Sequence, residues 1–329
     1  MAISVNNGIR EGIYRSALVR GISRWLDVVP HPLIACEIAP GYVAAARWTR
    51  GGVSLEGFAV ESLLPGAIVP SAVETNILMV AEVRSAVGRV FARLRAKGQT
   101  VALLVPDPVV PVFVLHFDTF PRRRAEAEPL LRWRLKKSTP FEAEETIISF
   151  MRQAPRDEGV DVVTALGRLR IVREYEQLMQ SVGMSPGVVL SSTLAALPLL
   201  EDRRPSLLAR VSGNNLTTAI TRAGILWNYR CIGLPGDASE LSPQNLLDEI
   251  YPVTTYYQDS WKEGLAVVRL AGLGQRVEEF REPLERELNC PAASLLASAA
   301  SDGRLGSDQK SLADRDLDAL VGWTMSRGA

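Results

Sequence analysis

The feature that most constrains the fold of this chain is an order of elements that occurs twice. In the first occurrence, residues 33–59 contain three short strand-like runs separated by tight turns at 39–41 and 50–52. Runs of this length with glycine-containing turns between them predict a three-stranded antiparallel meander. A long amphipathic helix is expected at 72–97, where apolar residues recur every three or four positions, and a valine-rich strand is expected at 101–105.

The same order returns in the second half of the chain. A second meander is expected at 206–232, followed by a helix at 241–261, a strand at 267–271 and a helix at 276–288. A flexible loop is expected at 298–311, before a final helix. In a chain of 329 residues, a repeated α/β pattern of this kind predicts two related lobes.

Between the two patterns lies the most distinctive stretch of the chain, residues 101–141. Two valine-rich runs flank a Pro-Asp-Pro turn, where a strand must end because proline cannot donate to a sheet, and a charged helix is expected at 122–137. We interpret the segment from about 106 to 175 as an insertion. The expected division of the chain is an N-terminal amphipathic extension at 1–32, a first lobe at 33–190 that contains this insert, a second lobe at 191–312, and a C-terminal helix at 313–329 that packs back on the body.

Four short motifs give the chain a family resemblance. They are Val105-Pro106-Asp107, Phe120-Pro121, Leu131-Arg132-Trp133 and Thr139-Pro140-Phe141. In this order, with a strand after the first motif and a helix around the third, they resemble the PilM family of type IV pilus assembly proteins. The cytoplasmic domain of the type II secretion protein GspL is a relative of that family. The resemblance covers most of residues 33–326 and implies an actin-like (ribonuclease H-like) bilobal α/β fold with an inserted subdomain in the first lobe.

The resemblance also implies a function. It is that of a non-catalytic cytoplasmic adaptor, peripheral to the inner membrane, in a type IV pilus or type II secretion-like assembly complex. The implied partner is the cytosolic tail of a PilN-like inner-membrane protein, with other pilus or secretion assembly proteins as further candidates. In the family, the inserted subdomain helps to form the groove for that tail, and such a groove can hold an extended peptide through backbone hydrogen bonds.

By position, the expected partner-binding residues are Leu130, Trp133, Arg134 and Phe141. All four lie in or just after the charged helix of the insert. The alternative is that Trp133 and Phe141 belong to the core.

In actin-like proteins a nucleotide lies between the lobes. Two hairpin turns offer backbone N–H groups to its phosphates, and an aspartate helps to hold hydrated magnesium. The resemblance places the first of these turns between Glu37 and Gly41. Glu37 keeps a carboxylate, but Ala39 stands where glycine is expected, and Pro40 has no N–H group to donate.

The other two parts of a nucleotide site depart further from the pattern. Arg210 stands where an aspartate is expected, so that a cation replaces the carboxylate on the magnesium side. The glycine motif on the adenine side is reduced to Gly-X-Gly, which serves equally as a tight strand-to-helix turn. The residues of these two parts are Arg210, Ser212, Gly213, Asn214, Gly272 and Gly274.

Because all three parts are altered, the sequence predicts a pseudo-ATPase with no catalytic residue, no metal site and no resident cofactor. Two alternatives remain. One is an active actin-like ATPase with magnesium-dependent ATP binding, which would need an aspartate near the second turn. The other is weak binding of nucleotide without metal.

The N-terminal extension has a separate pattern. Residues 1–8 are expected to be irregular, whereas at 9–29 apolar residues recur at near-helical spacing with arginines between them. A basic amphipathic helix of this kind can lie on an anionic membrane surface. The residues expected to do so are Arg10, Arg15, Arg20, Arg24 and Trp25. The alternatives are a helix docked on its own domain and a poorly ordered extension.

Composition excludes several functions. Basic and acidic residues balance at 37 each, and the basic runs of the insert are mixed with glutamates, which argues against nucleic-acid binding. The three cysteines and two histidines show no disulfide framework, zinc-ligand spacing or nucleophilic catalytic arrangement. No apolar run approaches the roughly 18 to 20 residues needed to cross a bilayer, so the chain is not expected to span a membrane by itself.

Overall fold

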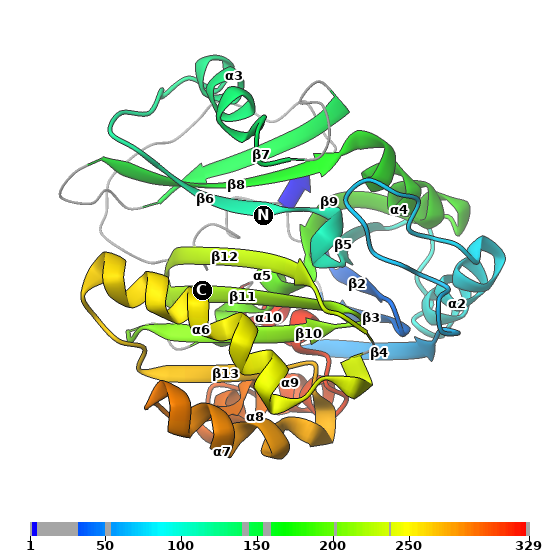
Figure 1. Ribbon diagram of the computed structural model, residues 1–329. Helices are drawn as coiled ribbons and strands as arrows, with labels where there is room; N and C mark the ends of the chain where they lie inside the picture. Colours follow the sequence, from blue (N-terminus) through cyan, green and yellow to red (C-terminus); the bar gives the residue numbers. More distant parts are fainter. Residues whose placement is uncertain are drawn as a thin grey trace.

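The computed structural model describes residues 2–4, 32–49, 54–139, 145–153, 159–200, 203–236 and 238–326. These residues form three β-sheets with helices packed on them (Figure 1). One large sheet forms the centre of each lobe, and the small third sheet belongs to the inserted segment. In this part of the chain, no helix is both long and apolar enough to cross a membrane.

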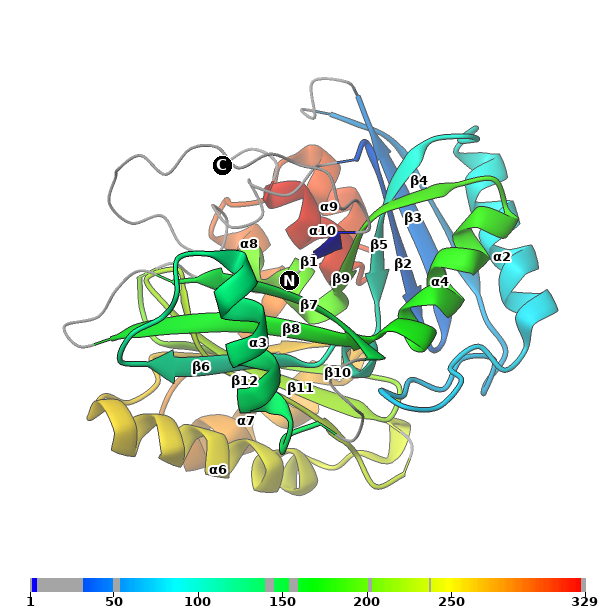
Figure 2. The ribbon, with the colours of Figure 1, turned by 90° about the horizontal axis from the view of Figure 1, so that it is seen from above.

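The first lobe is built on a six-stranded sheet with the strand order β1-β9-β5-β2-β3-β4. β2, β3 and β4 form the expected antiparallel meander, while β5 and β9 run parallel to β2. Helices α2 and α4 lie together on one face of this sheet (Figure 2). The elements are β1 (Ala2–Ser4), β2 (Ile34–Ala39), β3 (Tyr42–Trp48), β4 (Leu55–Ser62), β5 (Thr100–Val105), β9 (Ser185–Ser191), α2 (Val80–Arg93) and α4 (Leu169–Ser181).

The second lobe is built on a five-stranded sheet with the strand order β12-β11-β10-β13-β14. β10, β11 and β12 form the second antiparallel meander, and β13 runs parallel to β10. Helices α6 and α7 supply apolar side chains such as Leu246, Tyr257 and Phe280 to its core. The elements are β10 (Ser206–Ser212), β11 (Asn215–Arg222), β12 (Ile225–Gly233), β13 (Val267–Ala271), β14 (Ala292–Ser294), α6 (Pro243–Trp261) and α7 (Val277–Leu288).

The inserted segment forms a separate small layer. A 3-10 helical turn (Asp107–Val109) leads from β5 into a three-stranded sheet with the order β6-β8-β7. Helix α3 packs on this sheet around Phe120, Leu131 and Leu135, and the layer lies over β12 of the second lobe (Figure 1). The elements are β6 (Val112–Phe117), α3 (Arg124–Leu135), β7 (Thr146–Arg152) and β8 (Val160–Arg168).

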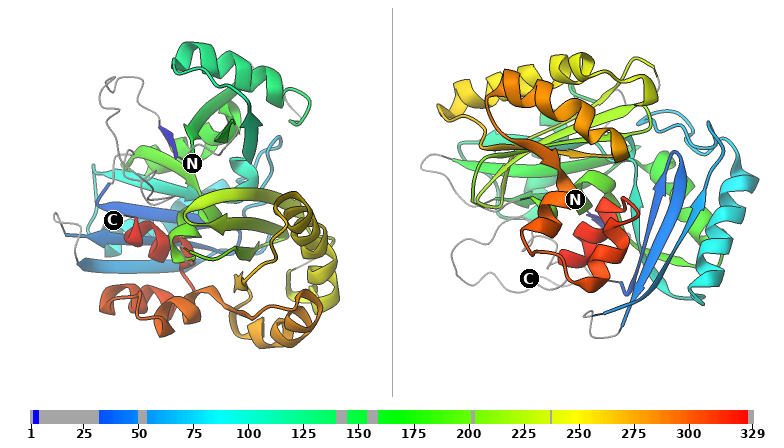
Figure 3. Two further views of the ribbon diagram at one scale, coloured as in Figure 1. Left: turned by 90° about the vertical axis from the view of Figure 1, so that its left-hand side faces the viewer. Right: turned by 90° about the horizontal axis from the view of Figure 1, so that it is seen from below.

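Helices from the second half of the chain complete the core of the first lobe. α5 (Ser192–Ala196), α8 (Leu295–Ser301), α9 (Ser307–Ala313) and α10 (Asp318–Met325) gather on the side of the first sheet away from α2 and α4 (Figures 2 and 3). α10 lies so close to α5 that a Cβ atom at Gly322 would be 2.2 Å from the carbonyl oxygen of Ala195. The C-terminal helix therefore packs on the body, and α5 shares the first core although it follows the boundary expected at residue 190.

Three expected elements differ from the structure. The helix expected at 72–97 begins only at Val80, because the buried Asn76 side chain donates to the carbonyl oxygens of Ser71 (2.9 Å) and Glu74 (2.7 Å) and so stabilises a turn. The loop expected at 298–311 contains the end of α8 and most of α9. Residues 1–8, expected to be irregular, include β1, which pairs with the distant β9.

Candidate functional site

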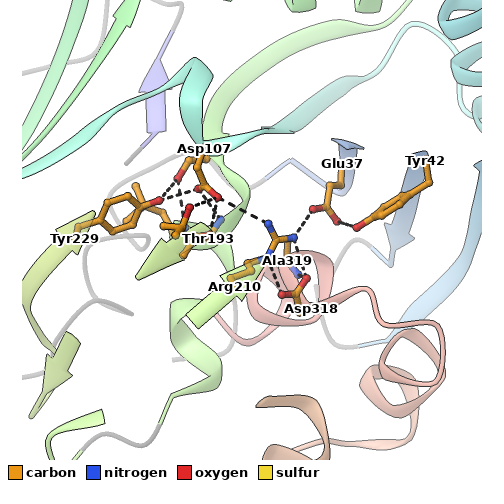
Figure 4. A network of polar contacts seen from close by, with 11 residues as sticks. Glu37, Tyr42, Asp107, Thr193, Arg210, Tyr229, Asp318 and Ala319 are labelled. Carbon is orange, nitrogen blue, oxygen red and sulfur yellow. Dashed lines mark hydrogen bonds and ion pairs between the residues drawn. The ribbon is translucent and has the colours of Figure 1, made fainter. Parts of the chain in front are cut away.

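The candidate site lies between the lobes and is centred on Arg210 of β10. This side chain is almost fully buried and is held by carboxylates from two distant parts of the chain (Figure 4). Its Nε and Nη2 atoms donate to the two carboxylate oxygens of Asp318 at 2.7 and 3.0 Å. Nη2 also donates to Oε1 of Glu37 at 2.9 Å. One ion-pair network therefore joins β2 of the first lobe, β10 of the second lobe and the start of α10.

Burial determines the ionisation of this network. Burial raises the pKa of Glu37 above its ordinary value, while Arg210 opposes that rise and Asp318 adds to it. Burial by itself would lower the pKa of Arg210, but Asp318 and Glu37 raise it well above the ordinary value. The hydroxyl of Tyr42 donates to Oε2 of Glu37 at 3.0 Å, and burial beside Glu37 raises the pKa of Tyr42. The guanidinium is thus a permanent cation, and with its raised pKa Glu37 takes up a proton more readily than an ordinary glutamate.

A second polar cluster is centred on Asp107, whose Oδ2 atom lies 3.9 Å from Nη1 of Arg210. Oδ1 accepts from the backbone N–H of Thr193 (3.1 Å) and the hydroxyl of Tyr229 (2.7 Å). Oδ2 accepts from the hydroxyls of Thr193 (2.7 Å) and Thr217 (3.0 Å). A carboxylate has about four acceptor positions, so that Asp107 is fully satisfied. Thr217 and Tyr229 belong to the second lobe, and this cluster is therefore a second connection between the lobes.

The insert is attached to the second lobe by a third contact. The side-chain amide of Gln153, which follows β7, donates to the carbonyl oxygen of Leu226 at 2.7 Å and accepts from its N–H group at 2.8 Å. The amide thus pairs with the backbone of β12 as a neighbouring strand would. This contact fixes the insert over the second lobe.

The two turns expected to bind phosphate meet each other. A Cβ atom at Gly213 would lie 2.9 Å from Cγ of Pro40, so the turn after β2 touches the turn after β10. Gly272 lies against the backbone of Val211 in β10, where a Cβ atom at Gly272 would be 1.8 Å from the carbonyl oxygen of Val211. In this arrangement Pro40 and Gly213 are in contact where the resemblance places the two phosphate-binding turns.

A small cavity of about 20 Å³ lies beside the glycine motif. Its lining includes Gly272, Gly274, Asp316 and Asp318. A water molecule needs at least about 10 to 15 Å³ of such space, so this cavity can hold water but is far too small for a nucleotide. Burial, together with the nearby charge of Asp318, raises the pKa of Asp316.

The structure brings most of the expected nucleotide-site residues together. Glu37 and Arg210 are directly bonded, and Ala39 and Gly41 belong to the turn that meets Gly213. On the other side of the network, Gly272 and Gly274 line the small cavity.

Two of the expected residues lie outside the network. Ser212 is half-buried at the end of β10. Asn214 is exposed, and its carbonyl oxygen accepts from the N–H group of Leu234 at 2.7 Å.

The sequence did not point to Asp318, and Asp107 was identified as part of a turn and of a family motif but not as a residue of the site. Asp318 begins α10, in which the next six residues are all buried, and a carboxylate at the start of such an apolar helix is a signal of a buried ion pair. Asp107 stands between two prolines, which suffice to explain a turn. Its hydrogen-bond donors are at least 86 residues away in sequence, so that no local pattern connects them.

The expected partner-binding residues lie on or just after α3. Trp133 is 72% exposed, so the alternative that it belongs to the core is wrong. Arg134 is exposed as well, while Leu130 is half-buried against the core of the insert. Figure 1 places α3 on the outer side of the insert. Residues outside the described part of the chain include Phe141 and the expected membrane-surface residues Arg10, Arg15, Arg20, Arg24 and Trp25.

The chemistry of the network is that of a connection between lobes. The guanidinium of Arg210 lies among Glu37, Asp107 and Asp318, where it supplies the positive charge that these carboxylates require. A magnesium ion needs oxygen ligands at about 2.0 to 2.1 Å, which do not fit while the same oxygens bind a guanidinium. Within the described ranges, no group of three or more His, Cys, Asp or Glu residues could hold a metal ion. The residues present therefore do not fit a magnesium–nucleotide complex in this arrangement.

Comparison with known proteins identifies the fold. No family model and no curated protein matches the sequence. Among solved structures, a chain of a PilM–PilN type IV pilus biogenesis complex has a TM-score of 0.67 and 17% sequence identity, over 90% of this chain and 98% of that chain. The actin-like bilobal fold expected from the resemblance is thereby confirmed.

Weaker likenesses have TM-scores below 0.5 and do not bear on function. One is the cytoplasmic domain of EpsL, an inner-membrane component of the type II secretion system of Vibrio cholerae, with a TM-score of 0.45 and 11% identity over 72% of this chain and 80% of that chain. Another is a Bacteroides thetaiotaomicron protein with an actin-like ATPase fold and unknown function, with a TM-score of 0.47 and 10% identity over 90% of this chain and 97% of that chain.

Proposed function

We propose that this protein is a non-catalytic adaptor in a type IV pilus or type II secretion-like assembly complex, at the cytoplasmic side of the inner membrane. The observation that carries the proposal is the buried Arg210 network, in a protein whose fold is that of a PilM–PilN complex chain. In an actin-like ATPase the space between the lobes holds the nucleotide. In this protein, side chains from both lobes fill the corresponding space and bind each other.

The network supports the absence of ATP hydrolysis in two ways. Arg210 places a cation where a magnesium-binding carboxylate would be needed, and it neutralises Glu37, the carboxylate that remains in the first turn. Pro40 removes a donor from that turn and packs against Gly213 of the opposite turn. A nucleotide would have to break the charged hydrogen bonds of Arg210 and separate the turns before it could bind.

The proposed partner is the cytosolic tail of a PilN-like inner-membrane protein. A binding role is consistent with the exposure of Trp133, because aromatic side chains with large apolar area often dominate the binding energy of interfaces. Arg134 beside it offers charge complementarity to an acidic group on the tail. The insert that carries both residues has its own core and is attached to the second lobe by Gln153.

Titration calorimetry with a synthetic PilN-like tail from the same organism tests the partner. We expect micromolar binding by the native chain and a loss of at least about tenfold in affinity for Trp133→Ala, as for a typical interface hot spot. Tyr251→Ala is the matched control, since Tyr251 is an exposed aromatic residue (54%) on α6 of the second lobe. Absence of binding at high micromolar concentration, or equal effects of the two variants, would contradict the proposed partner surface.

The non-catalytic role has its own test. We expect purified protein to show neither magnesium-dependent ATP binding in calorimetry nor ATP turnover. Magnesium-dependent turnover that Glu37→Ala abolishes would instead establish the active ATPase alternative. Binding of ATP that is equally weak with and without magnesium would leave the adaptor role in place and add a metal-free ligand.

A further inference from the structure

The outer edge of β9 is a site where a further strand can be added. β9 pairs on one side with β5 in parallel, and on the other side its partner in the described part of the chain is β1. Val188, Val189 and Leu190 are fully buried. Successive residues of a strand direct their N–H and C=O groups to opposite sides, so the groups among these residues that face away from β5 need a partner on the outer side of β9.

That partner is the chain's own N-terminus. Ala2, Ile3 and Ser4 pair antiparallel with Leu190, Val189 and Val188, respectively. β1 also contacts β7 and β8, so it lies between the first sheet and the insert (Figures 1 and 2). A strand in this position therefore has the body of the first lobe on one side and the insert on the other.

β1 differs from the other strands of its sheet. It pairs through three residues, whereas β2, β3, β4, β5 and β9 are six to eight residues long. It is also remote in sequence, since residues 5–33 separate it from β2. A short strand at the end of a long connection opens with a smaller free energy than the strands in the middle of the sheet.

We propose that β1 occupies the outer edge of β9 reversibly, and that it competes for this edge with an extended peptide from a partner. The kind of partner is set by the geometry: a segment without regular structure of its own that can run antiparallel to Val188–Leu190 and take over the backbone hydrogen bonds. This competition rests on the proposed tail binding and adds a second contact of the tail, on β9, to the one proposed at Trp133 on α3. The pairing of β1 with β9 does not depend on the tail.

The size of the effect follows from the connection. β1 belongs to the same chain as β9, so its pairing is intramolecular and corresponds to an effective concentration of about millimolar, at which even a weak strand pairs most of the time. If β1 is paired with β9 in about nine molecules out of ten, the apparent affinity of a competing peptide for this edge falls about tenfold. The N-terminus would then set a threshold concentration for the partner.

Proline substitution in the full-length chain tests the occupancy. Adjacent residues of a strand direct their N–H groups to opposite sides, so at least one of Ile3→Pro and Ser4→Pro removes a hydrogen bond to β9. We expect that variant to raise hydrogen exchange by at least about tenfold at those amides of Val188–Leu190 that point toward β1, with no change at the alternate amides, which point toward β5, or in the strands of the second lobe. A synthetic peptide of residues 1–8, added to this variant, should restore the protection, and the same peptide carrying Ile3→Pro should not.

The competition is then measured with the PilN-like tail. We expect the proline variant with raised exchange to bind the tail about five to ten times more tightly than the native chain. Equal affinities would overturn the competition while the adaptor role stands. If no chain binds the tail, the proposed function fails, but the exchange experiment still decides whether β1 occupies β9. Unchanged exchange in both proline variants overturns the occupancy itself.

Discussion

Replacement of Arg210 by methionine is the sharpest test of the interlobe network. Methionine keeps an unbranched side chain of similar length but removes the charge and the donors. The variant loses hydrogen bonds to Asp318 at 2.7 and 3.0 Å and to Glu37 at 2.9 Å, and it leaves both carboxylates buried without their cation.

The size of the loss can be worked out from these contacts. Hydrogen bonds to charged groups contribute about 1.5 to 3 kcal/mol each, but they are not additive when they share one side chain. Removing one partner of a buried ion pair costs about 3 to 5 kcal/mol. We therefore expect Arg210→Met to lower the free energy of unfolding by about 3 to 5 kcal/mol in urea denaturation at pH 7, a large part of the stability of a typical domain.

Two further variants make this experiment specific. Arg222→Met removes a half-exposed arginine that pairs with Glu263 at 2.7 Å, and it should cost no more than about 1 kcal/mol. In the double variant Arg210→Met/Asp318→Asn, part of the loss should be recovered because one uncompensated charge is gone. If Arg210→Met costs less than about 1 kcal/mol, or if Asp318→Asn recovers nothing, the network does not hold the lobes together as described.

Three other predictions concern the same region. Burial raises the pKa of Glu37 above its ordinary value of 4.5, so that between these two values the folded protein binds a proton that the unfolded chain releases. The free energy of unfolding should therefore fall as the pH rises from about 4.5 through the raised pKa. Glu37→Gln should remove this fall in urea titrations. Asp107→Ala should lower the free energy of unfolding by about 2 to 4 kcal/mol in the same assay, because Thr193 and Tyr229 lose their buried acceptor. A loss no larger than that of a typical surface substitution, about 0.5 kcal/mol, would show that Asp107 does not connect the lobes. Gly322→Ala should cost about 1 to 3 kcal/mol, since the added Cβ atom would meet the carbonyl oxygen of Ala195 at 2.2 Å; an unchanged thermal midpoint would show that α10 can shift freely.

The repeating parts of the fold could be predicted because their signals are local. The strand expected at 267–271 coincides with β13, and the helix expected at 241–261 differs from α6 by two residues at its start. In both cases the residue period and the turn residues of the segment decide the structure. The prediction of a helix at 72–97 was wrong at its start, where the buried side chain of Asn76 binds the backbone and competes with helix formation. The burial of Asn76 depends on the tertiary structure, so the local sequence does not show it.

The candidate site was predictable only in part, for a related reason. The altered residues Glu37 and Arg210 were visible because each departs from a family pattern at a known place. Their contact, at 2.9 Å across 173 residues of sequence, was not visible, and neither was the role of Asp318. β1 escaped prediction for the same reason, since three residues carry no periodicity and their partner strand begins at residue 185.

The amide contact of Gln153 has a mechanical consequence. It holds β12 at Leu226, while Asp107 holds the same strand at Tyr229, three residues or about 10 Å further along. Two attachment points on one strand resist rotation as well as separation, whereas a single point would act as a pivot. The insert and the second lobe are therefore expected to move together, so that a rotation of the insert would carry β12 with it.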